Sequence, residues 1–215
     1  MRPLAVAWDA GGTLIDSEPI HLRALLRVAA EHGADLSGWT DDAFVGVALP
    51  DVWTAVAPRF RGIDGAAFAR LVNAAYVAEI AGAVHAPGAR EALGGIAACG
   101  VAQAAVSNSH CAVAEANRDA LGVRALLRCV VALEDVSRPK PDPAPYLCAA
   151  GRLGIATRRM IAVEDSAPGA ASALSAGCET IAVAPVAEPG ARLTVVRALA
   201  EAADVIRARI ACGAA

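Results

Sequence analysis

Lysine is nearly absent from this chain of 215 residues, because 18 of its 19 basic residues are arginine and the remaining one is Lys140. Any chemistry that requires an ammonium group must therefore use this one position. Acidic residues number 22, which leaves a formal net charge of −3. A chain with so small a net charge lacks the basic surface that binds nucleic acids or anionic membranes, so we expect neither partner.

Long apolar runs and the cysteine patterns of metal sites are missing as well. No segment approaches the roughly 20 apolar residues of a membrane-spanning helix. Asp9 interrupts the first apolar segment where the core of a secretory signal peptide would have to continue. The six cysteines form no C-x-x-C pair, which predicts free thiols in a reducing compartment. We therefore expect a cytoplasmic protein that is a monomer or a weak homodimer.

Short apolar segments alternate with helical patterns over most of the chain. The predicted strands cover residues 4–8, 101–106, 126–131, 160–163 and 180–184. The predicted helices between and after them cover residues 89–99, 110–121, 143–153, 167–176 and 193–210. This alternation predicts an α/β fold with a Rossmann-like parallel sheet. Residues 17–82 show only helical patterns, so we expect a core domain of residues 1–16 and 83–215 with an inserted helical cap of residues 17–82.

Polar side chains follow three of the predicted strands, at Asp9, at Ser107 and at Glu164-Asp165. The carboxyl ends of parallel strands meet at one edge of a sheet, so these side chains are expected to share one crevice. Three clustered carboxylates repel one another unless a hard cation such as Mg²⁺ lies among them. Ser107 adds a hydroxyl before a turn into a helix, and Lys140 adds a positive charge. Together these groups indicate phosphoryl transfer to an aspartate nucleophile.

Each of these residues also has a simpler explanation when it is taken alone. Asp9 could be an ordinary turn residue, and Ser107 could cap the following helix. Lys140 could be a surface charge, and Glu164-Asp165 could be the acidic start of a helix. The order and spacing of all four positions along the chain favour the common site.

The four motifs resemble those of the haloacid dehalogenase-like superfamily, in its phosphatase and β-phosphoglucomutase-like branch with a small helical cap. The family motif D-x-D-G-T-L-x-D-S-E resembles residues 9–18, and its second motif resembles residues 106–109. Lys140 matches the third motif in its K-P-x-P setting, and residues 164–166 match the fourth. The resemblance extends from about residue 4 to about residue 185.

The resemblance implies a role for each matching residue. Asp9 would be the nucleophile that forms an aspartyl-phosphate, assisted by Ser107 and Lys140. The residues that would hold the phosphoryl group are Gly12, Thr13, Ser107, Asn108 and Lys140. The residues that would surround Mg²⁺ are Asp9, Gly11 through its carbonyl, Glu164 and Asp165. By analogy with the branch, the partner would be a small phosphorylated metabolite, with a sugar or polyol phosphate favoured.

Gly11 departs from the family pattern, because the phosphatases carry a second aspartate at this position. That aspartate protonates the leaving group and then activates water, and loss of a general acid/base removes about 10²–10⁴-fold in rate. The chain could be a slow or selective phosphatase, with Glu18 or His21 as a substitute from the cap. It could instead be an impaired protein that binds phosphate esters without hydrolysing them, or a phosphatase that the glycine has inactivated.

Three other chemistries of the superfamily are less favoured. A phosphonoacetaldehyde hydrolase needs a cap lysine for its Schiff base, and Lys140 lies in the core motif. Dehalogenases usually carry tyrosine at position 11 and do not need the cation site that Glu164-Asp165 indicates. A phosphomutase relies on the missing aspartate and on an arginine within the segment 45–51, which here contains Ala-Leu-Pro at 48–50.

Overall fold

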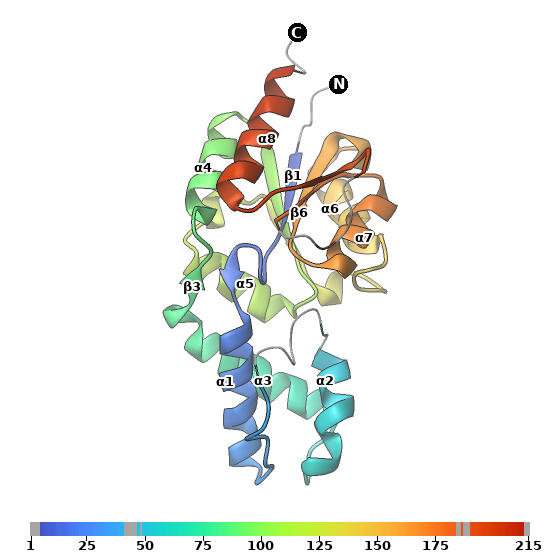
Figure 1. Cartoon of the computed structure of the whole chain (residues 1–215). Coiled ribbons are helices and arrows are strands. Elements are labelled where there is room, and N and C mark those ends of the chain that lie inside the picture. Colours follow the sequence, from blue (N-terminus) through green and yellow to red (C-terminus); the bar gives the residue numbers. More distant parts are fainter. Residues whose placement is uncertain (1–4, 41–46, 48, 184–185, 187–189, 213–215) are drawn as a thin grey trace.

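A single parallel sheet of six strands forms the centre of the molecule, with the strand order β5-β4-β1-β6-β7-β8 (Figure 1). The computed structural model describes residues 5–40, 47, 49–183, 186 and 190–212. The strands of this sheet are β1 (Ala5–Asp9), β4 (Ala102–Val106), β5 (Cys129–Val131), β6 (Met160–Glu164), β7 (Glu179–Ala182) and β8 (Leu193–Val195). All five neighbouring pairs are parallel, which confirms the predicted α/β fold.

Helices cover both faces of this sheet, and the central strand β1 is buried along its whole length. Its side chains alternate: Val6 and Trp8 belong to one apolar cluster, whereas Ala5 and Ala7 belong to the other. On the sheet, the first cluster includes α4 (Ala89–Ala98) and α8 (Leu199–Cys212), and it continues beyond the sheet into other helices. The second cluster includes α6 (Ala144–Leu153) and α7 (Ala167–Ala176). Because successive side chains of a strand point to opposite faces, β1 contributes side chains to both core layers.

The carboxyl ends of the three central strands meet at one edge of the sheet. Asp9 ends β1 and pairs with Val106, the last residue of β4, while β6 ends at Glu164 on the other side of β1. The chain runs from β1 outward to β4 on one side and from β6 outward to β7 on the other, which creates the crevice where α/β proteins bind ligands. The three predicted polar positions therefore lie at this edge.

Three α-helices of the described residues are inserted between two very short strands, β2 (Ile15–Asp16) and β3 (Val84–His85), which pair antiparallel. The inserted helices are α1 (Glu18–Glu31), α2 (Leu49–Val56) and α3 (Gly65–Glu79), and Figure 1 shows them beyond the carboxyl edge of the sheet. They have an aromatic cluster of their own, in which Trp53 and Phe60 pack on buried Phe68. This layer faces the sheet edge across the polar positions.

The remaining helical elements connect the strands at the surface. Helix α5 (Cys111–Ala120) packs between β5 and the inserted helix α3. The short 3₁₀ helices in the described part of the chain are η2 (Ala57–Arg59), η3 (Ile80–Gly82), η4 (Arg124–Leu126), η5 (Leu133–Asp135) and η6 (Thr157–Arg159). Among the described residues, no helix combines the length and apolar character that crossing a membrane requires.

The predicted terminal helix of residues 193–210 is wrong at its start. Residues Leu193–Val195 form β8 beside β7, and α8 begins only at Leu199. Leu193 and Val196 are buried together with Leu199, so the apolar spacing over this junction fits a helix although part of it is a strand. The paired strands β2 and β3 are two residues long each, which is too short for a sequence pattern to reveal.

Candidate functional site

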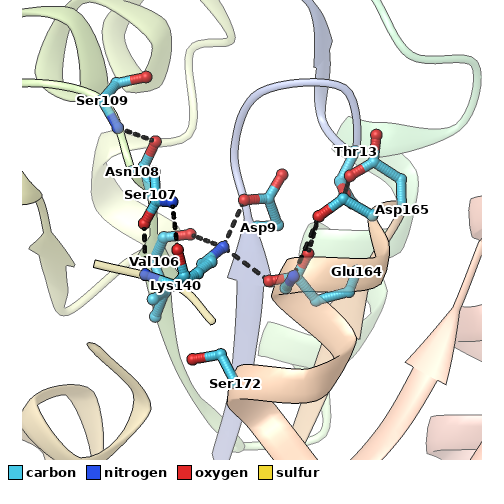
Figure 2. Close-up of polar contacts among 12 residues, drawn as sticks. Asp9, Thr13, Val106, Ser107, Asn108, Ser109, Lys140, Glu164, Asp165 and Ser172 are labelled. Carbon is cyan, nitrogen blue, oxygen red and sulfur yellow. Dashed lines mark hydrogen bonds and ion pairs between the residues drawn. The ribbon is translucent and has the colours of Figure 1, made fainter. Parts of the chain in front are cut away.

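Lys140 connects three elements at the carboxyl edge of the sheet (Figure 2). Its Nζ lies 2.6 Å from Asp9 Oδ1 and 2.6 Å from Glu164 Oε1, and it donates to the Val106 carbonyl at 2.9 Å. Burial alone would lower the pKa of Lys140, but the two carboxylates outweigh burial and raise it. The lysine therefore keeps its charge in the interior, and its alternative explanation as a surface residue is wrong.

Asp9 has one carboxylate oxygen committed and one available. Oδ1 accepts from Lys140, whereas the buried Oδ2 has no hydrogen-bond partner among the described residues. A buried charged oxygen without a partner is costly unless a ligand or an ion completes it. Asp9 Oδ2 is thus the carboxylate oxygen of this residue that is available to contact phosphorus or a cation.

Glu164 is fully buried and is held from several sides. Besides Lys140, it accepts hydrogen bonds from the Tyr146 hydroxyl and, at 3.4 Å, from Ser166 Oγ. A Cβ added to Gly169 in α7 would lie 1.8 Å from Glu164 Oε2, so only a glycine lets the helix approach this closely. The start of α7 and the hydroxyl of Tyr146 therefore fix the carboxylate against Lys140.

Asp165 directly follows Glu164 and is held in place by the turn that follows β1. Thr13 Oγ1 donates to Asp165 Oδ1 at 3.1 Å. Gly12 has a φ of +81°, and a Cβ added there would lie 2.0 Å from Asp165 Oδ2. The Gly12 amide, expected to hold phosphate, instead donates to the Ile15 carbonyl at 2.8 Å. Gly12 therefore provides space for Asp165, and its expected role as a phosphate donor is not supported, because the turn uses its N–H.

The three carboxylates fit a hard divalent cation. Asp9, Glu164 and Asp165 each offer an oxygen, and these oxygens all lie within 4.8 Å of one another. Burial, together with the nearby charge of Asp9, raises the pKa of Asp165 to about 7. The raised pKa of Asp165 reflects repulsion between carboxylates, which a bound cation would relieve. Asp9 Oδ2, which has no hydrogen-bond partner among the described residues, is available as a ligand for such a cation. The donor set is the all-oxygen type that Mg²⁺ prefers.

The residues after β4 form a second arm of the site. Ser107 is buried, its N–H donates to the Val131 carbonyl at 2.9 Å, and its Oγ accepts from the Ser109 N–H at 3.1 Å. Asn108 exchanges two hydrogen bonds with the main chain of Lys140, at 3.1 and 2.9 Å. The N-cap of α5 is His110, so the alternative in which Ser107 caps this helix is wrong. The Asn108 side chain fixes the lysine segment in place.

The first turn of α1 closes the site from the side of the inserted helices. Ser17 is the N-cap residue of α1 but makes no side-chain capping hydrogen bond, contrary to the usual role of serine there. Its buried hydroxyl instead donates to Glu18 Oε2 at 3.4 Å. Burial lowers the pKa of His21 to about 4, and its ring packs on Tyr76 with centroids 4.3 Å apart. His21 is therefore neutral at pH 7.

A cavity of about 450 Å³ lies between the sheet edge and the inserted helices. The predicted site residues that line it are Asp9, Gly11, Glu18, His21, Ser107, Asn108, Lys140 and Asp165. Gly12, Thr13 and Glu164 lie behind this surface and support it. The fold therefore brings together the positions that the sequence separates by up to 156 residues, from Asp9 to Asp165.

Several contributors to the site were not predicted from the sequence, Tyr146 and Asn73 among them. Tyr146 supports Glu164, and Asn73 of α3 lines the cavity. Tyr146 follows Lys140 by six residues in a proline-rich segment, and only the orientation of α6 reveals its contact. Of the segment 45–51 that was compared with phosphomutases, residues 45, 46 and 48 lie outside the described part of the chain.

Comparisons with known proteins give a consistent family. The family described as haloacid dehalogenase-like hydrolase matches residues 6–183. Hexitol phosphatase A of Escherichia coli is 34% identical over 185 residues, which cover 85% of this chain and 84% of the relative. Validoxylamine A 7'-phosphate phosphatase of Streptomyces hygroscopicus is 29% identical, with 79% and 80% covered. The crystal structure of CbbY from Rhodobacter sphaeroides in complex with phosphate shares the fold, with a TM-score of 0.80, 22% identity, and 92% and 95% covered.

Proposed function

Because this chain belongs to the haloacid dehalogenase-like hydrolases, we propose that it is an Mg²⁺-dependent phosphatase acting on a small sugar or polyol phosphate. The class of reaction, hydrolysis of a phosphoric monoester, rests on the likeness to two phosphatases over most of the chain. The finer steps below rest on the arrangement of this chain's own side chains.

One observation carries the proposal, namely the state of the Asp9 carboxylate. Lys140 holds Oδ1 at 2.6 Å, while the buried Oδ2 has no hydrogen-bond partner among the described residues. A carboxylate oxygen that is fixed, desolvated and unpaired is suited to attack an electrophile beside it. Asp9 also lines the cavity, so a phosphoryl group bound there would lie within its reach.

In the first step, Asp9 Oδ2 forms a bond to phosphorus, and the bond from phosphorus to the leaving oxygen breaks. The Lys140 ammonium offsets the negative charge that gathers around Asp9 and the phosphoryl oxygens. We assign the contacts to those oxygens to the Ser107 hydroxyl and to the main-chain N–H group of Asn108, both of which line the cavity. In the second step, water attacks phosphorus and releases Asp9 and inorganic phosphate.

The residues that would hold Mg²⁺ are Asp9, Asp165 and the carbonyl of Gly11, with Glu164 beside them. When bound, the ion supplies positive charge to the phosphoryl oxygens and neutralises the carboxylates. Glu164 has a second task in this proposal, because its contacts with Lys140 and Tyr146 orient the ammonium group.

The inserted helices of residues 17–82 would act as the cap over the substrate. They contribute His21 and Asn73 to the cavity wall opposite Asp9. Such a layer excludes water from the reacting groups and contacts the part of the substrate beyond its phosphate. The substrate class follows the relatives, whose names are hexitol phosphatase A and validoxylamine A 7'-phosphate phosphatase.

Phosphate release from a panel of sugar and polyol phosphates tests the proposal. We expect turnover with Mg²⁺, none with a chelator, and none for Asp9→Asn in either condition. An Asp9→Asn protein that is folded and still active would overturn the aspartyl-phosphate mechanism.

Gly11 supports a second candidate function, an impaired protein that binds phosphate esters without hydrolysing them. The residue provides no carboxylate for proton transfer at the position where the family's phosphatases have one. Calorimetric binding of a hexitol phosphate without any release of inorganic phosphate would favour this candidate.

A further inference from the structure

We propose that Glu18, at the start of α1, is the general acid and base that replaces the carboxylate missing at position 11. This inference rests on the proposed phosphatase function and adds to it the residue that moves the proton. It concerns the protonation of the leaving alcohol and the activation of water, which no other assigned residue of the site performs.

Glu18 lies close to Gly11, the position that lacks the carboxylate. Glu18 lines the same cavity as Asp9 and Gly11 and is the first residue of α1. A Cβ added to Gly11 would lie 2.9 Å from Ser17 Oγ, and this hydroxyl donates to Glu18 Oε2 at 3.4 Å. The Ser17 hydroxyl is therefore close both to the position that lacks a side chain and to the carboxylate of Glu18, so Glu18 lies near the region that an aspartate at position 11 would serve.

The surroundings of Glu18 favour its protonated form. Glu18 is half-buried, and burial is the largest of the effects that raise its pKa. The charges of Asp16 and Asp9 act in the same direction, and Glu18 in turn raises the pKa of Asp165 and of Tyr76. A carboxyl group in such surroundings holds a proton more readily than an exposed one, as a general acid must.

Among the described residues that line the cavity, the other titratable groups are not available as the general acid. Asp9 is the nucleophile, Lys140 is bound to two carboxylates, and Asp165 belongs to the cation site. His21 is neutral at pH 7 because burial lowers its pKa to about 4, so it carries no proton to give as an imidazolium. His110 is paired with Glu134 through its Nδ1 at 2.8 Å. Glu18 is the carboxyl group that remains.

Glu18 would give up one proton in the first step and regain one in the second. As Asp9 Oδ2 bonds to phosphorus, the bond to the substrate's ester oxygen breaks and that oxygen keeps the electron pair. The proton of the Glu18 carboxyl moves to this oxygen, and a neutral alcohol leaves. The Glu18 carboxylate then takes a proton from water as the water oxygen bonds to phosphorus, Asp9 is released, and Glu18 is protonated again.

The test compares Glu18→Gln, which keeps the size but loses the proton, with Glu31→Gln at the far end of α1. Glu31 is exposed and paired with Arg27, so its variant controls for a change of charge on the same helix. With a hexitol 6-phosphate, whose leaving group is an alkoxide, we expect Glu18→Gln to lose about 10²–10⁴-fold in kcat and Glu31→Gln to stay within about twofold.

A second substrate separates proton transfer from a structural role. The leaving group of p-nitrophenyl phosphate needs no proton, so Glu18→Gln should release one equivalent of nitrophenol in a burst and then stall. Intact-mass measurement should find the stalled protein carrying a phosphoryl group, and the added change Gly11→Asp should restore turnover.

Two results would overturn the inference while the phosphatase function stands. One is an active native protein whose Glu18→Gln variant keeps its activity on the hexitol phosphate. The other is an equal loss on both substrates with no burst, which would mark Glu18 as a structural residue. A native protein that hydrolyses neither substrate would instead reject the proposed function, and this inference with it.

Discussion

The two walls of the cavity hold their acidic groups in different ways. At the sheet edge, Asp9 and Glu164 are each 2.6 Å from Lys140, and glycines let the main chain approach Glu164 and Asp165 closely. On the opposite wall, at the start of α1, Glu18 is half-buried and accepts a hydrogen bond of 3.4 Å from Ser17. One wall is fixed by many contacts and the other by few.

This difference separates two requirements of the reaction. The groups that face the phosphoryl charge depend on three strand ends and Lys140 at once, so the fold itself determines where they lie. Proton transfer depends on a single side chain that needs only to reach the leaving oxygen. Such a group can be supplied from a different element without any change to the sheet, as we propose for Glu18.

The largest expected effect comes from removing the nucleophile on the fixed wall. Asp9→Asn keeps the shape of the side chain but removes its charge, so we expect phosphate release to fall below detection, at least about 10⁴-fold. Thermal unfolding should show that the variant remains folded. Residual turnover above about 1% of the native rate would show that another group attacks phosphorus.

The next effect tests how tightly the fixed wall is packed, and the chain offers a matched pair of helical glycines. Gly169→Ala places a Cβ 1.8 Å from Glu164 Oε2, whereas a Cβ on Gly151 meets nothing within 4 Å. We expect Gly169→Ala to lose at least about 100-fold in activity, because Glu164 must move away from Lys140. Gly151→Ala should keep its activity and gain up to about 1 kcal/mol in unfolding free energy, since alanine favours helix.

Urea unfolding and phosphate release, measured on both variants, check this prediction. If Gly169→Ala is fully active, then Glu164 does not need its present position. If both variants lose activity to the same extent, the loss comes from the helices in general and not from the contact with Glu164.

A smaller effect concerns the cation on the fixed wall. Mg²⁺ at 100 times its Kd should raise the unfolding free energy by about 2.7 kcal/mol, since it binds only the folded protein. Because the pKa of Asp165 is raised to about 7, protons compete with the ion, and the Mg²⁺ effect should shrink as the pH falls from 8 to 5. Asp165→Asn should abolish most of the effect at pH 8.

The same carboxyl also contributes to the pH dependence of stability without metal. The folded protein keeps the Asp165 proton up to about pH 7, whereas the unfolded chain releases it near its ordinary value of 3.8. Asp165 therefore makes the metal-free protein less stable as the pH rises from about 4 to about 7, and Mg²⁺ should reverse this contribution. His21, whose pKa is lowered to about 4, acts in the opposite direction over much of this range, so the contribution of Asp165 is the difference between the native protein and Asp165→Asn. Thermal unfolding of both proteins across this range, with and without Mg²⁺, measures that difference. A metal-free difference that does not change with pH would show that Asp165 is ionised throughout.

Chemistry at the strand ends made the fixed wall predictable from the sequence. Asp9, Ser107, Lys140 and Glu164-Asp165 are polar residues at the ends of apolar segments or between prolines, and parallel strands bring such positions together. The α/β alternation likewise predicted the sheet, except where β8 imitates the start of a helix.

Contacts that depend on the path of a turn or the rotation of a helix were not predictable in this way. The Gly12 amide is used within its own turn by Ile15, which no spacing rule indicates. Tyr146 is one apolar residue of α6 by pattern, and its hydroxyl reaches Glu164 only because of how α6 lies on the sheet. The weakly held wall is similar, since the direction of Ser17 away from a capping role cannot be read from its type.

The smallest expected effect is the one that distinguishes the two walls most directly. Gly11→Asp adds the missing carboxylate to the fixed side. Its Cβ would lie 2.9 Å from Ser17 Oγ, so the short Ser17 side chain must rotate. If Glu18 already transfers the proton, the variant should change kcat on a hexitol 6-phosphate by less than about tenfold in the native background. In the Glu18→Gln background the same change should raise kcat by at least about 100-fold. A gain of 100-fold or more in the native background would mean that proton transfer is absent there, and the candidate of an impaired ester-binding protein would then describe the chain better.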